Sequence, residues 1–487
     1  MELLNIFSEL FLYDKNSPLL FSSGIFFILF TIFIIVYSQI YKKKIVYLLY
    51  VIAFSFFFYY KSSGWYLFIL VFTSVTDFSF AILIRKTKNL LEKRIFLFLS
   101  IASSLGILIY FKYTNFFLKS FYEIIEDNFQ LLDIFLPIGI SFYTFQSISY
   151  VLDVYWEKIK PTKNFLHYTF YLSFFPQLVA GPIVKAKDFL PQLKKEIILT
   201  NEMMYNGLFL ILVGLFKKGV IADYISQYND LIFLNPSGYS GFENLMAIYG
   251  YTLQIYCDFS GYSDMAIGLA LIMGFNLGEN FNFPYKAQNI TDFWRRWHIS
   301  LSSWLKNYIY IPMGGNRKGK IKQYRNLFLT MFIGGLWHGA NWKFVFWGGL
   351  HGIGLAVHKF FYNFLKKIGN NFFIKFISWF LTFHFVIFLW IFFRADSFDI
   401  AEKIIYQIIF DMNFNFAFVF FENRIFWIIL VITGFLISFL PEKFNKKMQI
   451  SFVKSPYLIK AFIFLIIVQL VIQFQSKDVQ PFIYFQF

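Results

Sequence analysis

The sequence predicts an all-α polytopic membrane protein with about eleven transmembrane helices and several re-entrant or interfacial helices. Three observations lead to this prediction. Of the 487 residues, 58% are hydrophobic and 24% are aromatic, which is unlike a water-soluble globular domain. Apolar runs long enough to cross a hydrocarbon layer of roughly 30 Å recur along the chain. The lysines gather in short loops between these runs, as the positive-inside rule expects of cytoplasmic loops.

The N-terminal part, residues 19–118, is expected to form peripheral helices. Its apolar runs alternate across the membrane in the order 19–40, 45–60, 65–84 and 95–118. Lys42, Lys43 and Lys44 place the first loop in the cytoplasm. The fourth run leads into an acidic loop, so the alternation places the N-terminus outside.

Residues 165–183 are expected to enter the membrane and return on the same side. Both flanks of this stretch are basic, and it contains Pro176 and Pro182. Proline removes a backbone donor and breaks a helix interior. A broken segment at membrane depth is tolerated where protein surrounds it.

Two carboxylates, Asp258 and Asp264, lie inside the apolar run 244–275. Ionisable groups within such a run are expensive and indicate a functional site. They are six positions apart, roughly 240° around a helix, so they are not expected to share one partner. Either they act in coupling, or a basic residue on a neighbouring helix neutralises each of them.

Residues 281–325 interrupt the apolar pattern. Tryptophans alternate there with Arg295, Arg296 and His298, a mixture that is typical of a membrane interface. We expect short amphipathic or re-entrant helices at the cytoplasmic face. The two arginines would receive an anionic ligand or anchor the chain to anionic headgroups.

The stretch 325–361 has two apolar halves around the polar run WHGANW, residues 337–342. His338 beside glycines and tryptophans is expected to line a cavity, and on a helix His338 and Asn341 would share one face. The alternative is a polar contact between helices. The remaining histidines, except His298, stand in ordinary apolar contexts and are expected to be packing groups: His167, His351, His358 and His384.

The C-terminal part, residues 425–487, is expected to hold two further crossings around a cytoplasmic basic loop, with the tail 477–487 outside. That loop carries Lys443, Lys446, Lys447 and Lys454. No soluble domain separates from the rest. We therefore expect one membrane domain over residues 1–487, with a core at 134–393.

Several classes of function are excluded. No GxSxG, HExxH, Walker A or GxGxxG pattern is present. A single cysteine, Cys257, excludes a disulfide framework and a thiolate metal cluster within one chain, and no metal site is expected. The net charge of +16 lies in loops beside apolar runs, which indicates a lipid bilayer rather than nucleic acid as the partner. A neutral imidazole near pH 7 is suited to accept a proton from a hydroxyl, so His338 and His298 are the candidate catalytic residues.

Four sequence stretches together resemble the membrane-bound O-acyltransferase (MBOAT) family. They are FFPQLVAGPIV, YCDFSGYSDMAIGLALIMGF, WRRWHISLSSWLKNYIYIPMGGNR and the WHG of the stretch 325–361. The resemblance is closest to the bacterial branch with alginate and peptidoglycan O-acetyltransferase subunits and the D-alanyl teichoic-acid transporter. It implies a ring of helices around a tunnel, the catalytic histidine at His338 and the second histidine at His298.

The resemblance implies acetyl transfer in a bacterial cytoplasmic (inner) membrane. A cytoplasmic thioester, most simply acetyl-CoA, would supply the acetyl group for hydroxyls of a cell-envelope polysaccharide. Peptidoglycan is favoured over alginate or another exopolysaccharide, and a periplasmic or extracellular acetyltransferase would complete the reaction. The candidates for donor binding and oxyanion stabilisation are Arg295, Arg296, Lys318, Trp337 and Asn341.

The C-terminal run PFIYFQF suggests a relay. It is too apolar for a tail in water, so it is expected to fold back and present the Tyr484 hydroxyl to His338. A similar tail is associated with this branch of the family, and the alternative is interfacial anchoring by the aromatic rings. Two other functions stay open. One is D-alanyl transfer to teichoic acid, and the other is secondary transport or lipid flipping with Asp258 and Asp264 as coupling groups.

Overall fold

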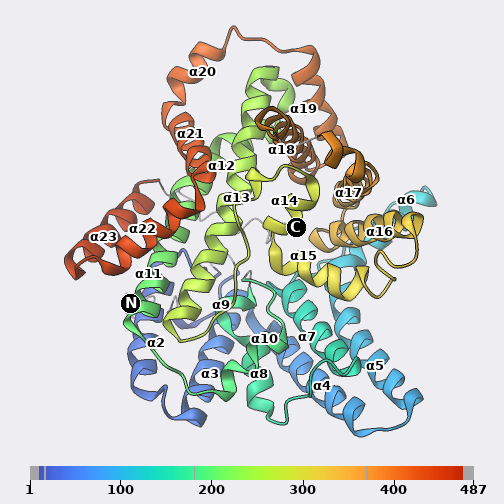
Figure 1. Ribbon diagram of the computed structural model, residues 1–487, viewed down its shortest axis with the longest axis vertical. Helices are drawn as coiled ribbons and strands as arrows, with labels where there is room; N and C mark the ends of the chain where they lie inside the picture. Colours follow the sequence, from blue (N-terminus) through green and yellow to red (C-terminus); the bar gives the residue numbers. More distant parts are fainter. Residues whose placement is uncertain (1–9, 16–17, 180, 369–370, 475–487) are drawn as a thin grey trace. The chain divides into compact units, whose positions relative to one another are not determined.

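Helices form all the regular structure in the computed structural model, which describes residues 10–15, 18–179, 181–368 and 371–474 (Figure 1). Contacts divide the chain into two compact units. The first comprises residues 1–211 and 265–278, and the second comprises residues 212–264 and 279–487. Helices α11 (Asn201–Leu215) and α13 (Gly241–Ile272) each contribute to both units. The expected single membrane domain stays a prediction.

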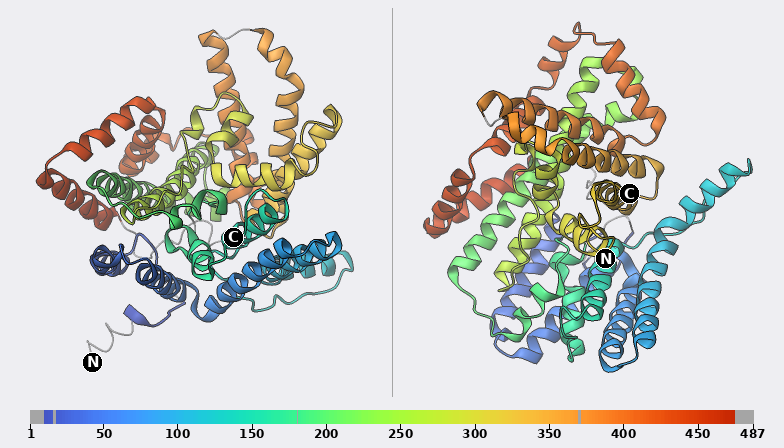
Figure 2. Two further views of the ribbon diagram at one scale, coloured as in Figure 1. Left: turned by 60° about the horizontal axis from the view of Figure 1, so that its bottom comes forward. Right: turned by 45° about the vertical axis from the view of Figure 1, so that its right-hand side comes forward.

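The first unit is built from helices joined by short turns and by longer loops, such as residues 125–139. Beside parts of α11 and α13, it contains α2 (Gly24–Ile40), α3 (Lys44–Ser63), η1 (Gly64–Tyr66), α4 (Leu67–Lys86), α5 (Leu90–Leu108), η2 (Ile109–Tyr113), α6 (Thr114–Ile124), α7 (Ile140–Tyr155), α8 (Phe165–Ser173), α9 (Phe175–Leu178), α10 (Ala186–Phe189) and η3 (Gln192–Lys194). Figure 2 shows α4 and α5, in light blue, side by side.

Aromatic packing and one polar cluster hold this unit together. The Phe175 ring of α9 contacts Phe33, Phe54 and Phe58, with ring centroids 5.7, 5.1 and 5.8 Å away. The buried carboxylate of Asp77 on α4 accepts hydrogen bonds from serine hydroxyls of α5 and α7, namely Ser100 (2.5 Å), Ser104 (3.1 Å) and Ser147. A buried charge needs such partners, so these bonds fix the three helices against one another.

The second unit holds the C-terminal half of the chain. Beside parts of α11 and α13, its helices are η4 (Phe216–Ala222), α12 (Asp223–Leu234), η5 (Pro236–Gly238), η6 (Pro284–Lys286), α14 (Ile290–Arg296), α15 (Ile299–Leu305), η7 (Lys306–Tyr310), α16 (Lys320–His338), α17 (Trp342–Ile368), α18 (Phe372–Arg394), α19 (Phe398–Phe410), α20 (Ala417–Asn423), α21 (Ile425–Phe439), α22 (Glu442–Lys454) and α23 (Tyr457–Phe474).

Helices α16 and α17 pack closely because glycines face each other where the two helices meet. A Cβ atom on Gly335 would lie 3.0 Å from the Cα of Gly348, and a Cβ on Gly348 would lie 2.9 Å from the Cα of Gly335. Small residues allow two helix backbones to approach in this way. The contact fixes the end of α16, where His338 lies.

The described residues form fewer helices long and apolar enough to cross a membrane than the sequence predicted. Among the described residues, four helical segments are long and apolar enough: Lys44–Lys86, Leu90–Ile124, Phe372–Arg394 and Tyr457–Phe474. A fifth is added if α20 and α21, bent by 88°, form one broken span. About eleven crossings are therefore not confirmed. Other expected crossings carry several charged groups, as α16 does with Lys320, Lys322 and Arg325.

Two predicted interruptions are confirmed. The stretch 165–183 breaks after Ser173 into α8 and the four-residue α9, whose second residue is Pro176. Residues 281–325 fold into short helices, η6, α14, α15 and η7, before α16 begins.

Candidate active site

His338 lies where α16 ends. The chain leaves the helix at Gly339, which has an extended backbone (φ −160°). The Asn341 side-chain oxygen accepts a hydrogen bond from the Lys343 amide (3.0 Å) and so caps the first turn of α17. The expectation that His338 and Asn341 share a helical face is therefore wrong, because the residues between them are not helical. Asn341 is exposed, whereas His338 is 2% exposed.

Aromatic rings enclose the His338 imidazole. Its ring centroid lies 5.1 Å from Trp337, 5.1 Å from Trp347 of α17 and 5.4 Å from Phe393 of α18. The Trp347 indole meets the imidazole edge-to-face, at 89°. Such contacts fix the plane of the ring and remove it from bulk water.

His298 occupies the turn between α14 and α15 in a left-handed backbone conformation (φ 43°, ψ 56°). A residue with a Cβ atom pays roughly 1–2 kcal/mol for this conformation, so the surrounding structure must hold it in place. The imidazole is fully buried, with Phe259 of α13 edge-to-face at 4.6 Å. Strained backbone of this kind concentrates at functional sites.

Asn280 determines which nitrogen of His298 carries the proton. The Asn280 side-chain oxygen accepts hydrogen bonds from the Ser300 amide (3.3 Å) and hydroxyl (2.8 Å), while its NH₂ group donates to Ser263 (3.0 Å). The same oxygen lies 3.2 Å from His298 Nδ1, so Nδ1–H is the donor and Nε2 carries the lone pair. Burial lowers the pKa of His298 to about 3, which keeps the ring neutral.

The Trp337 indole joins the two predicted histidines. Its ring centroid lies 5.1 Å from His338 and 6.1 Å from His298. Two histidines that are 40 positions apart in the sequence therefore contact one indole within the second unit. This arrangement can place a proton acceptor and an orienting group beside one substrate.

The sequence interpretation did not identify a third buried histidine beside these rings. His351 of α17 accepts a hydrogen bond at Nδ1 from the indole N–H of Trp294 (3.3 Å), and its ring centroid lies 4.6 Å from Trp347. An indole can only donate, so neutral His351 carries its proton on Nε2. Within the described part of the chain, His351 Nε2 and Trp347 Nε1 are buried and have no hydrogen-bond partner. They are donors that a substrate oxygen can use.

The sequence contains a signal for the Asn280 contacts, but none for His351. Asn276, Asn280 and Asn282 lie in the short loop between the apolar run 244–275 and the WRRWH motif. Buried amides in such a loop typically hold a neighbouring turn. His351 has the same apolar surroundings as a packing histidine, and only its contact with Trp294 distinguishes it.

The predicted donor-binding cations differ in their surroundings. Arg296 forms ion pairs with Asp292 (3.0 Å) and with Glu442 of α22 (3.8 Å), so its charge is already partly compensated. Arg295 and Lys318 are exposed. Tyr484, the predicted acyl relay, lies outside the described residues.

Lysines neutralise Asp258 and Asp264. Lys218 Nζ lies 2.6 Å from Asp258 and 2.7 Å from Asp223, and Lys217 Nζ lies 2.6 Å from Asp264. Each of the two predicted carboxylates has its own lysine on η4, as their angular separation implied. The alternative of neutralisation by a neighbouring helix is confirmed. Among the described residues, no group of three or more histidine, cysteine, aspartate or glutamate side chains could hold a metal ion.

The chain matches a known protein family over its central part. A model of the membrane-bound O-acyltransferase family matches residues 159–398. This segment includes His298, His338 and His351, together with the aromatic rings that enclose them.

Curated relatives extend this similarity. A peptidoglycan O-acetyltransferase of Helicobacter pylori is 41% identical over 370 residues, which cover 70% of this chain and 69% of that protein. A probable alginate O-acetylase of Pseudomonas aeruginosa is 43% identical over 344 residues, 69% of this chain and 65% of that protein. A teichoic acid D-alanyltransferase of Bacillus subtilis is 29% identical over 275 residues, 54% of this chain and 69% of that protein.

Proposed function

Because the chain belongs to the membrane-bound O-acyltransferase family, we propose that it transfers acetyl groups across a bacterial cytoplasmic membrane to hydroxyls of a cell-envelope polysaccharide. The donor is a cytoplasmic thioester, acetyl-CoA. Peptidoglycan is the favoured acceptor, and alginate or another exopolysaccharide comes next, in keeping with the names of the relatives. Both chain termini lie outside, where an exported acetyltransferase completes the transfer.

The observation that carries this proposal is that two buried histidines, His298 and His338, contact the same indole, that of Trp337. His338 accepts the proton of the attacking hydroxyl, whose oxygen forms a bond to the thioester carbonyl carbon. The carbon–sulfur bond then breaks, and the thiolate leaves with the proton from His338. Enclosure by aromatic rings keeps water away and suppresses hydrolysis of the thioester.

The neighbouring groups have supporting roles in this proposal. The Nε2 lone pair of His298 orients the donor or accepts a proton in transit, because Asn280 holds Nδ1 as the protonated nitrogen. His351 Nε2–H and Trp347 Nε1–H donate to the oxygen that becomes negative in the tetrahedral intermediate. Of the donors predicted from the sequence, Trp337 contacts His338, whereas Asn341 is exposed and caps α17. Arg295 and Lys318, both exposed, receive the anionic part of the donor.

The test of this function follows acetyl groups from labelled acetyl-CoA into envelope glycan. The wild-type protein is expected to consume the donor and leave acetyl ester on the glycan, whereas His338→Ala abolishes transfer although the protein still inserts. Undiminished transfer by the inserted variant would reject His338 as the base.

In this proposal Tyr484 carries the acetyl group between the membrane protein and its exported partner. Its phenol, with an ordinary pKa near 10, needs a base such as His338 to attack the thioester. Tyr484→Phe is expected to lose product formation while still binding the donor. If glycan ester forms at the wild-type rate in this variant, the relay is wrong.

Two other functions have weaker support. D-alanyl transfer rests on a relative that is 29% identical, compared with 41% and 43% for the relatives named for O-acetyl transfer. Identification of the acyl group released from the envelope by mild base separates the two. Secondary transport would need carboxylates available for coupling, and the lysine pairs of Asp258 and Asp264 argue for a structural role instead.

A further inference from the structure

Helix α22 differs from the helices on either side of it. It connects α21, whose bent pair with α20 is a candidate membrane span, to α23, an apolar candidate span with only 6% of its residues buried. The connections are short: Leu440 and Pro441 before α22, and Ser455 and Pro456 after it. If α21 and α23 both cross the membrane, the 13-residue helix between them lies close to the boundary between lipid and water.

The chain at the start of α22 contacts η6 and α14, and His298 lies two residues after α14. Glu442 forms an ion pair with Arg296 at the end of α14, and the Leu440 carbonyl accepts a hydrogen bond from Lys286 of η6. Glu442 is the one acidic residue of α22, so its charge is used in this attachment and does not offset the lysines further along.

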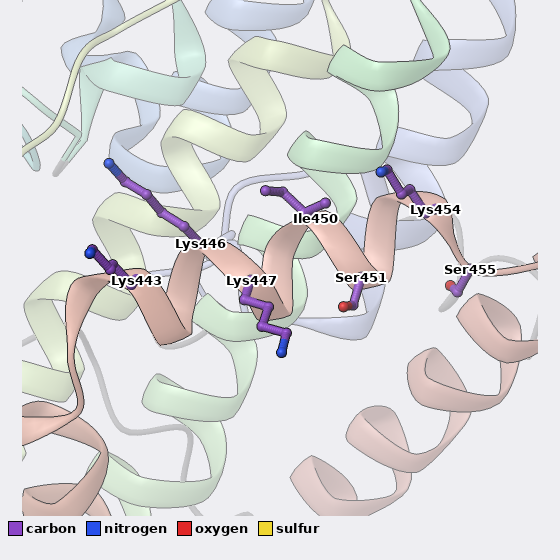
Figure 3. A pocket seen from close by; sticks show the side chains of 7 residues that line it. All are labelled: Lys443, Lys446, Lys447, Ile450, Ser451, Lys454 and Ser455. Atoms are coloured by element: carbon purple, nitrogen blue, oxygen red, sulfur yellow. The ribbon is translucent and has the colours of Figure 1, made fainter.

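Four exposed lysines line a hollow along this helix (Figure 3). The hollow has a volume of about 610 Å³ and is lined by Lys443, Lys446, Lys447, Ile450, Ser451, Lys454 and Ser455. Figure 3 shows Lys446, Ile450 and Lys454 projecting on one side of the helix and Lys447 and Ser451 on the other. Spacings of four residues place each set in one row along the helix.

These four lysines have no ion pair with any described residue. Apolar side chains lie among and beside them, since Ile450 is 53% exposed, Met448 49% and Phe444 46%. The exposed apolar side chains are unfavourable in water alone, and the neighbouring ammonium groups have no acidic partner among the described residues. This combination fits the layer where lipid phosphates meet acyl chains.

We propose that the lysine face of α22 binds the headgroups of anionic phospholipids of the surrounding bilayer. The phosphates neutralise Lys443, Lys446, Lys447 and Lys454, while Phe444 and Met448 contact the upper part of the acyl chains. The lipid fits better than a soluble phosphate compound, because a soluble ligand would cover the lysines and leave the exposed apolar side chains in water. This interaction is independent of the acyl-transfer chemistry.

The single cysteine makes a site-specific test possible. Cys257 is buried, so Ser451→Cys supplies one accessible thiol inside the hollow for a bimane fluorophore. The labelled protein is placed in phosphatidylcholine nanodiscs that contain equal small fractions of spin-labelled phosphatidylglycerol or spin-labelled phosphatidylcholine. Quenching by the anionic lipid is expected to be stronger by roughly fivefold, the factor that corresponds to ~1 kcal/mol of attraction for one lysine.

Matched variants show whether the four charges cause the difference. Replacement of all four lysines by Gln is expected to make quenching by the two lipids equal, whereas replacement by Arg retains the preference. Lys42→Gln, Lys43→Gln and Lys44→Gln, which remove exposed charge from the other unit, should leave it unchanged. Circular dichroism of each variant checks the fold, and the single changes Lys446→Gln and Lys447→Gln should each weaken the preference if the fourfold variant is unstable.

Three results would overturn the proposal. Equal quenching by both lipids in the wild-type protein would mean that α22 does not select anionic headgroups. Weak quenching by both would place the hollow away from the bilayer. Loss of the preference on addition of inorganic phosphate or CoA at constant ionic strength would assign the lysines to a soluble anion.

Discussion

At the scale of single residues, the candidate site depends on how neighbouring groups fix three histidines. Trp337 contacts both His298 and His338, Asn280 holds His298 Nδ1, and Trp294 donates to His351 Nδ1. Sequence reasoning identified His298 and His338 because each interrupts an apolar pattern. It missed Asn280 and His351, whose importance comes from contacts between residues distant in the chain.

The role of His351 leads to a prediction about rate. His351→Leu removes a buried donor and is expected to lower kcat for acyl transfer by roughly 10²–10³-fold, the range seen when one oxyanion donor is lost. KM should change little, because the interaction strengthens only in the transition state. Single-turnover and steady-state kinetics with labelled acetyl-CoA measure both constants.

A conservative variant separates this role from packing. His351→Gln keeps an N–H donor, so its kcat is expected to be higher than that of His351→Leu. If His351 only filled space, the two variants would have the same kcat. Wild-type kcat in His351→Leu would contradict the assignment.

At the scale of elements, the turn between α14 and α15 concentrates strain and burial. Its left-handed His298 is held by Asn280, and the Ile299 amide also donates to the Asn280 carbonyl (2.9 Å). The sequence predicted short helices in this region from the mixture of tryptophan and arginine. It did not predict the turn geometry, because a left-handed residue other than glycine has no reliable sequence signal.

Burial of His298 predicts how stability depends on pH. In the unfolded chain the ring takes up a proton near pH 6.5, whereas in the folded protein its pKa is about 3. The contribution of the neutral His298 ring to the free energy of unfolding is therefore complete above pH 6.5, and it is lost as the pH falls toward 3. Between pH 6.5 and 5 the loss is about 2 kcal/mol.

A replacement without a titrating ring tests this dependence. His298→Asn tolerates the left-handed backbone and should show a smaller decrease in unfolding temperature from pH 6.5 to 5 than the wild-type protein. Scanning fluorimetry in detergent measures both curves. Parallel curves for the two proteins would mean that His298 is not the buried neutral group inferred here.

At the scale of the whole molecule, composition and apolar runs predicted a helical membrane protein, but not the number of spans. Four or five helical segments of the described chain satisfy the length and composition criteria for a span, against about eleven expected. Helices such as α13 carry charged groups whose partners lie elsewhere in the fold, as Asp258 does with Lys218. A one-dimensional apolar pattern cannot anticipate those partners.

The C-terminal part carries the surface that we propose for lipid binding. The lysines at 443–454 were expected only to mark a cytoplasmic loop. In the structure they line a hollow along α22, between the apolar helices α21 and α23, and Glu442 at the start of α22 pairs with Arg296 of α14. The lysines that were expected to mark a loop are therefore a candidate lipid-binding surface.

The central claim is that His338 moves a proton during acyl transfer, and one measurement tests it most directly. Nanodiscs containing the protein receive labelled acetyl-CoA, envelope glycan and the exported acetyltransferase of the same bacterium. The acetyl ester on the glycan is quantified for the wild type, His338→Ala and, as a matched control, the partly exposed His384→Ala. The account predicts a loss of at least roughly 10²-fold for His338→Ala and little change for His384→Ala. Equal ester formation by wild type and His338→Ala would contradict it.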